Sequence, residues 1–540
     1  MAQQQTTPAS IKETLTSILI AFVLAFVFRG FVVEAFVIPT GSMAPTLRGQ
    51  FMEARSEQTG LTWAVGPRDY TPAGEAKQIQ GSQGKAITVH DLVTLAEADR
   101  FANEKLLAGD RIFVLKYLFS LYDPQRFDVV VFKNPNDPTM NYIKRLIGLP
   151  GEQLALIDGD IFTRPMSDAE DVPLKDDKEG KPWSLDGWSI ARKPELAQRA
   201  VWQQVFRSDL APLVQSKDGR KWPSPWRGGD GWLIEGRYDY QYKGARPTVL
   251  EWDSKNRSIE DSYSYNEASE SLGGTPYRFP VADVRVSLGV RPEKADLGVG
   301  VVISARGHEF RTSISGTTVR FEMRPAGDAT AAWQSIGGAN LSTPLPAGEV
   351  TNLEFWHADQ ELQLWREHTL VGRARYDWTP AQRLAASTGS TLAQLVSRDD
   401  TMEWLSNPAN YRPVQVRAEF TGGDFTLYRV GLDRDIFYRP DRYRGGNNGK
   451  LHTLVHTPAG GTHPFSTMRL DKNEFFMCGD NSPASLDGRL WDVPSPYVAP
   501  LDPDMGVVHR DLIIGRAFFV YFPAMHRKPV PDFGKMRWIW

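Results

Sequence analysis

MNYIKRLIGLPGEQLALIDGDIF, the stretch from Met140 to Phe162, contains two strand-like runs joined by turn signals. The run YIKRLIG is mostly apolar and β-branched, and QLALI follows it after the turn signal LPGE. The tripeptide Asp158-Gly159-Asp160 then has the residue pattern of a tight hairpin. The stretch therefore predicts consecutive antiparallel strands.

Three further segments on either side of this stretch, which we call the dense blocks together with it, also contain apolar, strand-like runs joined by turn signals. Gly109 to Pro135 contains the runs RIFVLKYLF and DVVVF around the turn DPQ, and Phe475 to Pro494 and the run DLIIGRAFFVYFP from Asp511 complete the set. The whole chain is also rich in turn formers and aromatics, with 46 Gly, 37 Pro and 27 Phe. We therefore expect a mainly β protein.

The N-terminus holds the one long apolar run of the chain, Thr14 to Phe28. As a helix this run reaches only about 22 Å, but the helix spans a full hydrocarbon thickness if Arg29 snorkels and the helix continues to Val33. A cleaved secretory signal is less well supported, because the start offers only Lys12 beside Glu13 and lacks a small-x-small cleavage site. A retained membrane anchor is the favoured interpretation, with a buried core helix as the third alternative, and the flanking charges are too weak to orient the anchor.

Two stretches of different composition interrupt the dense blocks. Gln50 to Ala108 is polar and includes DLVTLAEADRFANEKLLAG, whose pattern favours a helix that ends near Gly109. The stretch from Thr163 to about Phe437 is far longer, and from about residue 246 it is a succession of alternating strands with glycine-marked turns. This pattern predicts a β-sandwich inserted as a separate domain into a surface hairpin of the first domain.

The expected organisation is a mainly β chain with an antiparallel core, one N-terminal transmembrane helix and an inserted sandwich of jelly-roll type. We assign residues 1–13 to a short tail and residues 14–34 to the transmembrane helix. The core comprises residues 35–49, 109–162 and 438–540. A partly helical first insertion takes residues 50–108, and the second insertion takes residues 163–437.

Charge and cysteine content exclude several classes of function. The chain has 62 Lys and Arg against 65 Asp and Glu, so no polybasic surface indicates nucleic acid as a partner. The single cysteine, Cys478, cannot form an internal disulfide, and no Cys/His cluster has the spacing of metal ligands. We interpret Cys478 as a small buried apolar residue and expect neither a metal nor a cofactor.

Ser42 in FVIPTGSMAPTL is the candidate nucleophile, because Gly41 permits a tight turn and close approach of a substrate and Pro45 stiffens the backbone after the turn. A serine needs a base, and the nine histidines fall mostly in the insertions or in polar loops, without an orienting acid in a strand block. A lysine can serve if desolvation lowers its pKa from about 10.4. Lys144 has an apolar setting beside Ile143, although a lone lysine in a strand is more often a solvated edge charge.

The last dense block, GDNSPASLDGR, offers side chains that could support such a pair. Ser482 or Ser485 could orient the amine of Lys144. Two ion pairs could stiffen the surroundings, although each taken alone is more often plain structure: Asp487 with Arg489, and Asp480 with Arg145.

Four motifs after one N-terminal anchor, PTGSMAPTL, GDRIFVLKY, NYIKRLIGLPGE and GDNSPASLDGRLW, resemble type I signal peptidase, the bacterial leader peptidase family with a Ser/Lys dyad. The resemblance implies that Ser42 is the acylating nucleophile and Lys144 its general base. It implies an oxyanion hole made by the Thr40 hydroxyl and the Ser42 N–H. It also implies that Ser485 orients Lys144 and that the ion pair of Asp487 and Arg489 supports the dyad.

The same resemblance implies a membrane-bound serine endopeptidase that removes signal peptides from exported preproteins. Cleavage after small residues at P1 and P3 would follow from shallow apolar pockets, which clash with larger side chains. The positions that correspond to these pockets are Phe36, Ile38, Pro39, Met43, Leu47, Tyr142 and Ile143. The implied location is the bacterial inner membrane with the catalytic side outside, and the implied partners are secretory preproteins, the lipid bilayer and the protein-export machinery.

Alternatives remain open at this point. The stretch LEFWHADQELQLWREHTLVGRARYDW resembles concanavalin-like or laminin-G-like jelly rolls, so the inserted domain is either a sugar-binding domain or a spacer or docking domain. A self-cleaving repressor-type peptidase shares the dyad logic, but it would carry a helix-turn-helix where this chain has its apolar anchor. A membrane-anchored binding protein with an inactive peptidase scaffold is the alternative from a different class.

Overall fold

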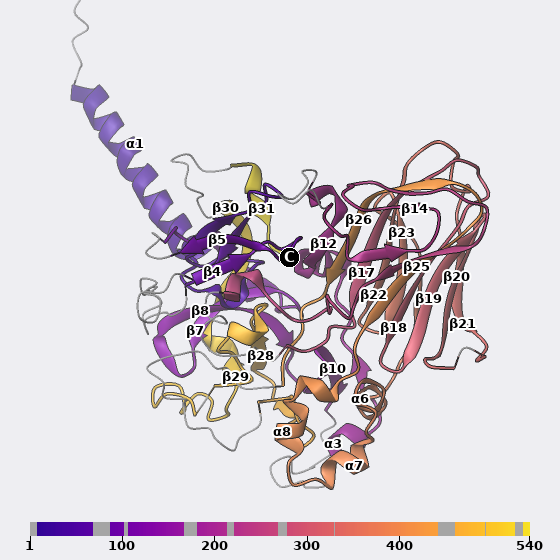
Figure 1. Ribbon diagram of the computed structural model, residues 1–540. Coiled ribbons are helices and arrows are strands. Elements are labelled where there is room, and N and C mark those ends of the chain that lie inside the picture. Colours follow the sequence, from indigo (N-terminus) through magenta and orange to yellow (C-terminus); the bar gives the residue numbers. More distant parts are fainter. Residues whose placement is uncertain are drawn as a thin grey trace, which may run out of the picture.

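The computed structural model describes residues 8–67, 87–101, 106–166, 181–212, 221–267, 278–328, 330–440, 459–491, 493–523 and 533–540. Within these ranges the chain is mainly β, its sheets are antiparallel, and one long apolar helix precedes them (Figure 1). The predicted fold class is therefore confirmed.

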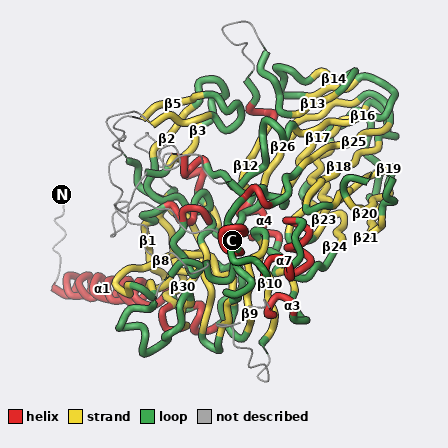
Figure 2. The backbone as a smooth tube through the Cα atoms, turned by 60° about the horizontal axis from the view of Figure 1, so that its bottom comes forward, coloured by secondary structure: helices red, strands yellow, loops and turns green. Residues whose placement is uncertain are grey.

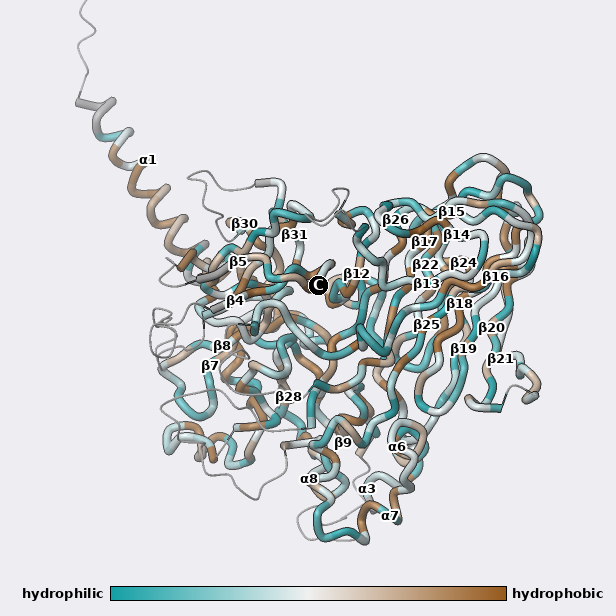
Figure 3. Tube along the Cα trace, viewed as in Figure 1, coloured by the Kyte–Doolittle hydropathy of each residue, from teal (hydrophilic) through white to brown (hydrophobic). Residues whose placement is uncertain are grey.

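The N-terminal helix α1 (Pro8–Val27) projects away from the body of the molecule and continues into a π-helical turn, η1 (Phe28–Val32) (Figures 1 and 3). The segment Lys12–Val32 has 21 residues and a mean hydropathy of 2.3, so it is long and apolar enough to cross a membrane. Its large apolar side chains, such as Phe22 and Leu24, are exposed. Strand β1 starts directly after it, at Val33, which ties the end of the helix to the core sheet.

The core sheet has eight strands, and the dense blocks supply most of them, whereas β1, β29 and β31 lie outside the blocks. Its order is β1–β6–β30–β7–β8–β28–β29, with β31 paired to β30. These strands are β1 (Val33–Val37), β6 (Arg111–Leu115), β7 (Val129–Asn134), β8 (Asp137–Gly148), β28 (Glu474–Cys478), β29 (Val507–His509), β30 (Ile513–Phe522) and β31 (Arg537–Trp538). Strand β8 therefore lies between β7 and β28, although the second insertion separates β8 from β28 in sequence.

A second, four-stranded sheet continues from the end of β8 and has the order β11–β10–β9–β27. Its strands are β9 (Glu152–Ile157), β10 (Asp160–Pro165), β11 (Ser189–Ile190) and β27 (Met468–Leu470). The predicted hairpin joins β9 to β10, and Asp158 and Gly159 at its tip have φ values of 50° and 84°. Positive φ at both central residues is the geometry that tight hairpins with this sequence adopt.

The inserted domain is a sandwich of two antiparallel sheets that lies beside the core (Figure 2). One sheet has the order β14–β15–β26–β17–β22–β23–β24 with β12 paired to β26, and the other has the order β13–β16–β25–β18–β19–β20–β21. A large apolar cluster that includes Trp252, Val286, Phe355 and Leu427 fills the space between them. Alternation of buried and exposed residues along the strands explains this two-sheet packing.

The strands of the sandwich start earlier than predicted. Their bounds are β12 (Gln203–Arg207), β13 (Trp226–Gly228), β14 (Trp232–Leu233), β15 (Tyr240–Tyr242), β16 (Thr248–Trp252), β17 (Val284–Pro292), β18 (Gly298–Ala305), β19 (His308–Ser315), β20 (Thr318–Pro325), β21 (Gln334–Asn340), β22 (Thr351–Ala358), β23 (Glu361–Arg366), β24 (Thr369–Arg375), β25 (Gln415–Thr421) and β26 (Phe425–Arg434). The expected start near residue 246 was wrong, because β12 to β15 are short strands in a polar lead, and β12 and β15 pair with the distant β26.

The helix expected in the first insertion was also wrong for the residues that the structure describes there. These residues form the hairpins of β2 (Met52–Arg55) with β3 (Thr62–Val65) and of β4 (Ile87–His90) with β5 (Glu97–Phe101). The Asp91 carboxylate accepts hydrogen bonds from the backbone N–H groups of Val93 and Thr94, and this local turn competes with a helix.

The helices of the body are short and lie outside the sheets. They are α2 (Leu118–Leu121), α3 (Lys181–Ser184), α4 (Glu195–Val201), α6 (Pro380–Thr388), α7 (Leu392–Val396) and α8 (Thr401–Leu405). The 3-10 turns include η2 (Gly41–Met43), η5 (Ser264–Asn266) and η7 (Ser482–Ala484). Helices α3, α6, α7 and α8 gather beside β10 at the bottom of Figure 1.

Candidate active site

Ser42 lies in the short 3-10 turn η2, directly after the first strand of the core sheet. Thr40 precedes the turn in an extended conformation, with φ −117° and ψ 161°, and the Ala44 N–H closes the turn by donating to the Gly41 carbonyl at 2.9 Å. The Ser42 side chain is nearly buried, with 9% of the residue exposed. The turn thus presents one hydroxyl in a largely water-excluded position.

Lys144 reaches this hydroxyl from the middle of the core sheet. Its Nζ lies 2.8 Å from Ser42 Oγ and also donates to the Ile143 carbonyl at 3.1 Å. On β8, Lys144 is opposite Val130 of β7, and only 3% of the residue is exposed. The structure therefore brings together the two residues of the predicted dyad, although 102 positions separate them in sequence.

Burial lowers the pKa of Lys144 from the usual 10.5 to about 8, because the ammonium form loses its hydration. The Asp487 carboxylate partly opposes this shift, and Cys478 and Asp480 oppose it further. The Lys144 ammonium also lies 4.9 Å from the centre of the Tyr142 ring. A free amine able to take a proton from a serine is therefore accessible at mildly alkaline pH.

A buried ion pair stiffens the loop beside the dyad. Arg489 Nε and Nη2 donate to the two carboxylate oxygens of Asp487 at 2.8 and 2.9 Å. Asp487 also accepts from the Gly479 N–H at 2.9 Å, and Arg489 Nη1 donates to Ser482 Oγ at 2.7 Å. The charge–charge contact keeps the pKa of Asp487 below its usual range despite burial. Asp487 and Arg489 thus form the pair that the sequence predicted.

The second predicted pair joins the dyad strand to the same loop. Arg145, next to Lys144 on β8, donates from Nε and Nη2 to Asp480 at 2.8 and 2.7 Å, and both side chains are fully buried. Its remaining nitrogen, Nη1, donates to the carbonyls of Phe127 and Trp540, each at 2.8 Å. A bidentate pair with these extra bonds fixes β8 relative to the loop.

Ser485 is buried beside these groups, but it does not contact Lys144 in the predicted way. Among the residues that the structure describes, its Oγ makes no hydrogen bond to Lys144 Nζ, and it lies close enough to Asp487 to help lower the pKa of that carboxylate. A Cβ added at Gly479 would lie 2.2 Å from Ser485 Oγ and 2.4 Å from the Ser42 carbonyl oxygen. Gly479 is therefore the residue that lets the Ser485 hydroxyl and the nucleophile turn approach one another, and the orienting role of Ser485 stays a prediction.

Five of the seven predicted pocket residues share one apolar cluster next to the dyad: Phe36, Ile38, Met43, Leu47 and Ile143. Met43 and Leu47 are completely buried, so Phe36 and Ile143, which are half-buried, offer the accessible surface. Tyr142 belongs to a different cluster, with Phe132 and Trp491, and Pro39 is exposed. Neighbouring residues of a strand point to opposite faces, which separates Tyr142 from Ile143.

A surface cavity of about 560 Å³ links the end of the N-terminal helix to this cluster. It is lined by Gly30, Phe31, Glu34, Phe36, Asn141 and Ile514, among others. Phe36 lies on β1 and Asn141 on β8, so the cavity touches both segments that lead to the dyad residues. The cavity therefore reaches the apolar cluster from the side of the apolar helix, and its lining does not include Ser42 or Lys144.

Two features of the site were missed in the sequence. Asn481 of the GDN motif donates from its backbone N–H to the Ser42 carbonyl at 3.0 Å and from Nδ2 to the Gly41 carbonyl at 2.9 Å. The open side of Gly41 faces the Tyr265 ring, because a Cβ there would lie 2.0 Å from Tyr265 Cε1. Gly41 thus makes room for the Tyr265 ring of the second insertion. We had expected it to leave room for a substrate.

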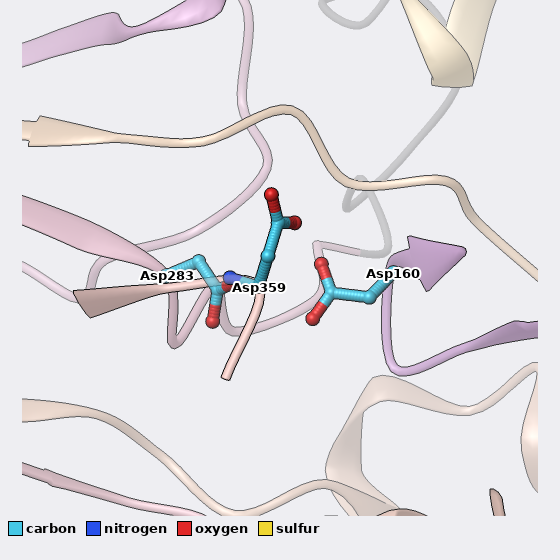
Figure 4. Close-up of side chains that lie close together, drawn as sticks. All are labelled: Asp160, Asp283 and Asp359. Carbon is cyan, nitrogen blue, oxygen red and sulfur yellow. The ribbon is translucent and has the colours of Figure 1, made fainter. Parts of the chain in front are cut away.

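The sandwich meets the second core sheet at a buried cluster of charges. Oxygen atoms of Asp160, Asp283 and Asp359 lie within 4.8 Å of one another, which is close enough for shared cation ligation (Figure 4). Basic side chains already fill this role: Arg306 contacts Asp283 at 2.6 Å, Lys193 contacts Asp359 at 2.5 Å, and Arg383 contacts Asp160. The cluster is therefore an ionic joint between the two domains.

Comparison with known sequences finds a family match in the segments that carry Lys144 and the GDN loop. The family described as "Signal peptidase, peptidase S26" matches residues 96–201 and 441–522. These ranges include Lys144 and the GDN loop, whereas Ser42 lies outside them. The matched segments are therefore similar to a signal peptidase domain, and the chain carries extra sequence around them.

Individual relatives lead to the same family. The chain is 30% identical to signal peptidase I of Rickettsia typhi over 156 residues, which is 29% of this chain and 44% of the relative. It is 28% identical to signal peptidase I of Rickettsia akari over 207 residues, which is 38% of this chain and 60% of that protein. The chain thus spans about half the length of the curated relatives it matches.

Among solved structures, the chain is similar to the carbohydrate binding module CBM66 from Bacillus subtilis. The identity is 11%, the TM-score is 0.22, and the match covers 39% of this chain and 95% of that one. A likeness of this degree carries no argument about the sandwich or its ligands.

Proposed function

We propose that the chain is a membrane-bound serine endopeptidase that removes N-terminal signal peptides from exported preproteins by a Ser/Lys dyad. The observation that carries the proposal is the 2.8 Å contact between Lys144 Nζ and Ser42 Oγ in a buried setting. The family match and the relatives named signal peptidase I support the substrate class. The apolar segment Lys12–Val32 supports attachment to a membrane.

In the proposed reaction, neutral Lys144 takes the proton of Ser42 while Oγ forms a bond to the carbonyl carbon of the P1 residue. The Thr40 hydroxyl and the Ser42 N–H stabilise the resulting oxyanion. The carbon–nitrogen bond then breaks as Lys144 returns the proton to the leaving amine. A water molecule deprotonated by Lys144 finally attacks the acyl-enzyme, and Lys144 passes this proton to Ser42 Oγ as the carbon–oxygen bond to Ser42 breaks.

Substrate selection follows from the surroundings of the dyad. Phe36 and Ile143 offer the accessible apolar surface beside Ser42, and we propose that small P1 and P3 side chains fit there. The cavity between Gly30 and Asn141 would receive the chain that follows a substrate's own apolar segment. This arrangement suits an enzyme anchored in the inner membrane, with its catalytic domain on the extracytoplasmic side, where exported chains emerge.

The test is preprotein cleavage by full-length protein in detergent. Ser42→Ala and Lys144→Met should each lower the cleavage rate by about 10²-fold to 10⁴-fold or more, because they remove the nucleophile and the base. Lys472→Met, which changes an exposed lysine near the start of β28, should cleave like the wild type. Wild-type rates for Ser42→Ala or Lys144→Met, or a wild-type protein that cleaves no preprotein, would overturn the proposal.

A further inference from the structure

A short segment of the second insertion, Ser262 to Glu267, is packed against the turn that carries Ser42. The Tyr265 ring lies between two glycines, and a Cβ added at Gly41 or at Gly66 would fall 2.0 or 2.2 Å from Tyr265 Cε1. Only residues without a side chain can take these two positions. The ring therefore fixes the distance between the nucleophile turn and the end of β3.

Hydrogen bonds hold Tyr265 in this position. Its hydroxyl donates to the Gln50 carbonyl at 2.6 Å, and its own carbonyl accepts from the Gly66 N–H at 2.7 Å. Gln50 in turn donates from its backbone N–H to the Pro39 carbonyl at 3.2 Å. Tyr265 thus connects the end of β3, through Gly66, to Gln50, which itself is hydrogen-bonded to the residue before Thr40.

Asn266 forms a reciprocal amide pair with Asn481. Asn266 Nδ2 donates to Asn481 Oδ1 at 2.7 Å, and Asn481 Nδ2 donates back to Asn266 Oδ1 at 2.8 Å. The second hydrogen of Asn481 Nδ2 goes to the Gly41 carbonyl at 2.9 Å. A carbonyl oxygen only accepts, so Asn481 must present its nitrogen to Gly41, and the pairing with Asn266 favours this orientation.

The segment is connected to the sandwich as well as to the dyad. Arg434, at the end of β26, donates to the Ser262 carbonyl at 2.6 Å, and its guanidinium lies 4.4 Å from the centre of the Tyr263 ring. The Tyr263 hydroxyl donates to the Asp480 carbonyl at 2.8 Å. A continuous set of buried contacts therefore runs from the sandwich to the GDN loop and on to Ser42.

We propose that Tyr265 and Asn266 are positioning residues for Ser42, so that the second insertion completes the catalytic turn of the peptidase core. Asn266 acts through Asn481 on the carbonyls of Gly41 and Ser42, and Tyr265 acts through Gly41 and Gln50. The role in signal-peptide cleavage rests on the proposed function above. The geometric role can be tested on Ser42 alone.

The primary experiment measures acylation of Ser42 in full-length protein by a β-lactam-type acylating probe. Asn266→Ala should lower the acylation rate about 10-fold, since a misplaced reacting group loses much of the benefit of orientation. With a preprotein substrate, kcat should fall by a similar factor while KM changes little. The limb of the pH profile that rises toward pH 8 should keep its midpoint, because the hydrogen bonds of Lys144 Nζ go to Ser42 and Ile143 and not to Asn266.

A double-mutant cycle separates positioning from general stability. In an Asn481→Ala background, Asn266→Ala should have little further effect on acylation, because its effect passes through Asn481. Asn410→Ala is the matched control: it removes a 2.7 Å side-chain hydrogen bond to the Trp404 carbonyl elsewhere in the insertion and should acylate like the wild type. Tyr265→Phe, which keeps the ring, should lose less activity than Tyr265→Ala.

The outcomes distinguish the two proposals. If the wild type is acylated at Ser42 but cleaves no preprotein, the proposed function fails, while the acylation rates of the variants still decide the positioning role. If Asn266→Ala is acylated at the wild-type rate, or if its defect is the same with and without Asn481, the positioning role is wrong even when preproteins are cleaved.

Discussion

Two buried lysines in two regions of the molecule have opposite pKa shifts. Lys144, in the core sheet, faces a hydroxyl and a backbone carbonyl, and burial lowers its pKa to about 8. Lys193, at the ionic joint with the sandwich, contacts Asp359 at 2.5 Å and Asp435 at 2.9 Å. Burial also acts to lower the pKa of Lys193, but these carboxylates raise it above the usual value.

The comparison shows that burial alone does not decide the state of a lysine. Each side chain is almost completely removed from water, so each pays a similar desolvation cost. The direct carboxylate contacts of Lys193 keep it charged and make it a structural cation. Among the described residues, the amine of Lys144 contacts a hydroxyl and a carbonyl but no carboxylate, and its proton is therefore held weakly enough for general-base chemistry.

The largest expected effect on stability is that of Lys193→Met. This change leaves the buried Asp359 and Asp435 without their cation, and we expect a loss of about 3–5 kcal/mol in the free energy of unfolding. Denaturant titration followed by circular dichroism measures it, with the exposed Lys472→Met as the control. Unfolding of Lys193→Met at the wild-type denaturant concentration would contradict a structural role for the joint.

The opposite sign is expected for Lys144→Met. The folded pKa of Lys144, about 8, lies below the usual 10.5, so the folded chain holds this proton less tightly than the unfolded chain. At about 1.4 kcal/mol per unit, charged Lys144 destabilises the fold by about 3 kcal/mol below pH 8, and this cost disappears as the pH rises to about 10.5.

At pH 7, Lys144→Met should therefore unfold at a higher denaturant concentration than the wild type. The gain in the free energy of unfolding is up to about 3 kcal/mol, reduced by the contribution of the hydrogen bonds that the substitution removes. Its advantage should shrink as the pH rises from about 8 to about 10.5. Measuring unfolding of both proteins at pH 7 and at pH 10 checks this. If the difference in the free energy of unfolding between the two proteins is the same at both pH values, the charge of Lys144 does not destabilise the fold.

The sequence was sufficient to predict most of the core strands and the proximity of Ser42 and Lys144, but not the strands β1, β29 and β31. The runs around Lys144 and in DVVVF became β8 and β7, and the motif order placed Ser42, Lys144, Asp487 and Arg489 in one site. These residues lie in dense apolar strands or tight turns, where local pattern and tertiary environment agree. Arg145 and Asp480 were likewise paired correctly from their charges and positions.

The contacts from the insertion could not be predicted in the same way. Asn266 and Asn481 are 215 positions apart, and neither the segment SYSYNE nor the GDN motif carries a pattern that indicates the other. The failed helix prediction in the first insertion has a related cause. Pairing of β4 with β5 and the turn at Asp91 outweighed a moderate helix propensity.

The low pKa of Lys144, in contrast to the raised pKa of Lys193, should also appear in the pH dependence of preprotein cleavage. If Lys144 is the base, kcat/KM should rise about tenfold per pH unit below pH 8 and level off above it, because only the neutral amine accepts the Ser42 proton. Initial rates with a preprotein lacking ionisable groups near the cleavage site measure this limb. A flat profile between pH 6 and pH 9 would exclude Lys144 as the titrating base.

The smallest expected effect is a shift of this limb in Asp487→Asn. The Asp487 carboxylate is the strongest of the groups that raise the pKa of Lys144, while Arg489 lowers it. Removal of the negative charge should lower the pKa of Lys144 and so move the midpoint of the limb to lower pH. This shift is opposite to the one that the carboxylates cause at Lys193. Asp123→Asn, which changes an exposed carboxylate, is the control and should leave the midpoint unchanged. The midpoint does not depend on the fraction of folded enzyme, so a shift to higher pH would contradict the assigned electrostatics even if the variant is less stable.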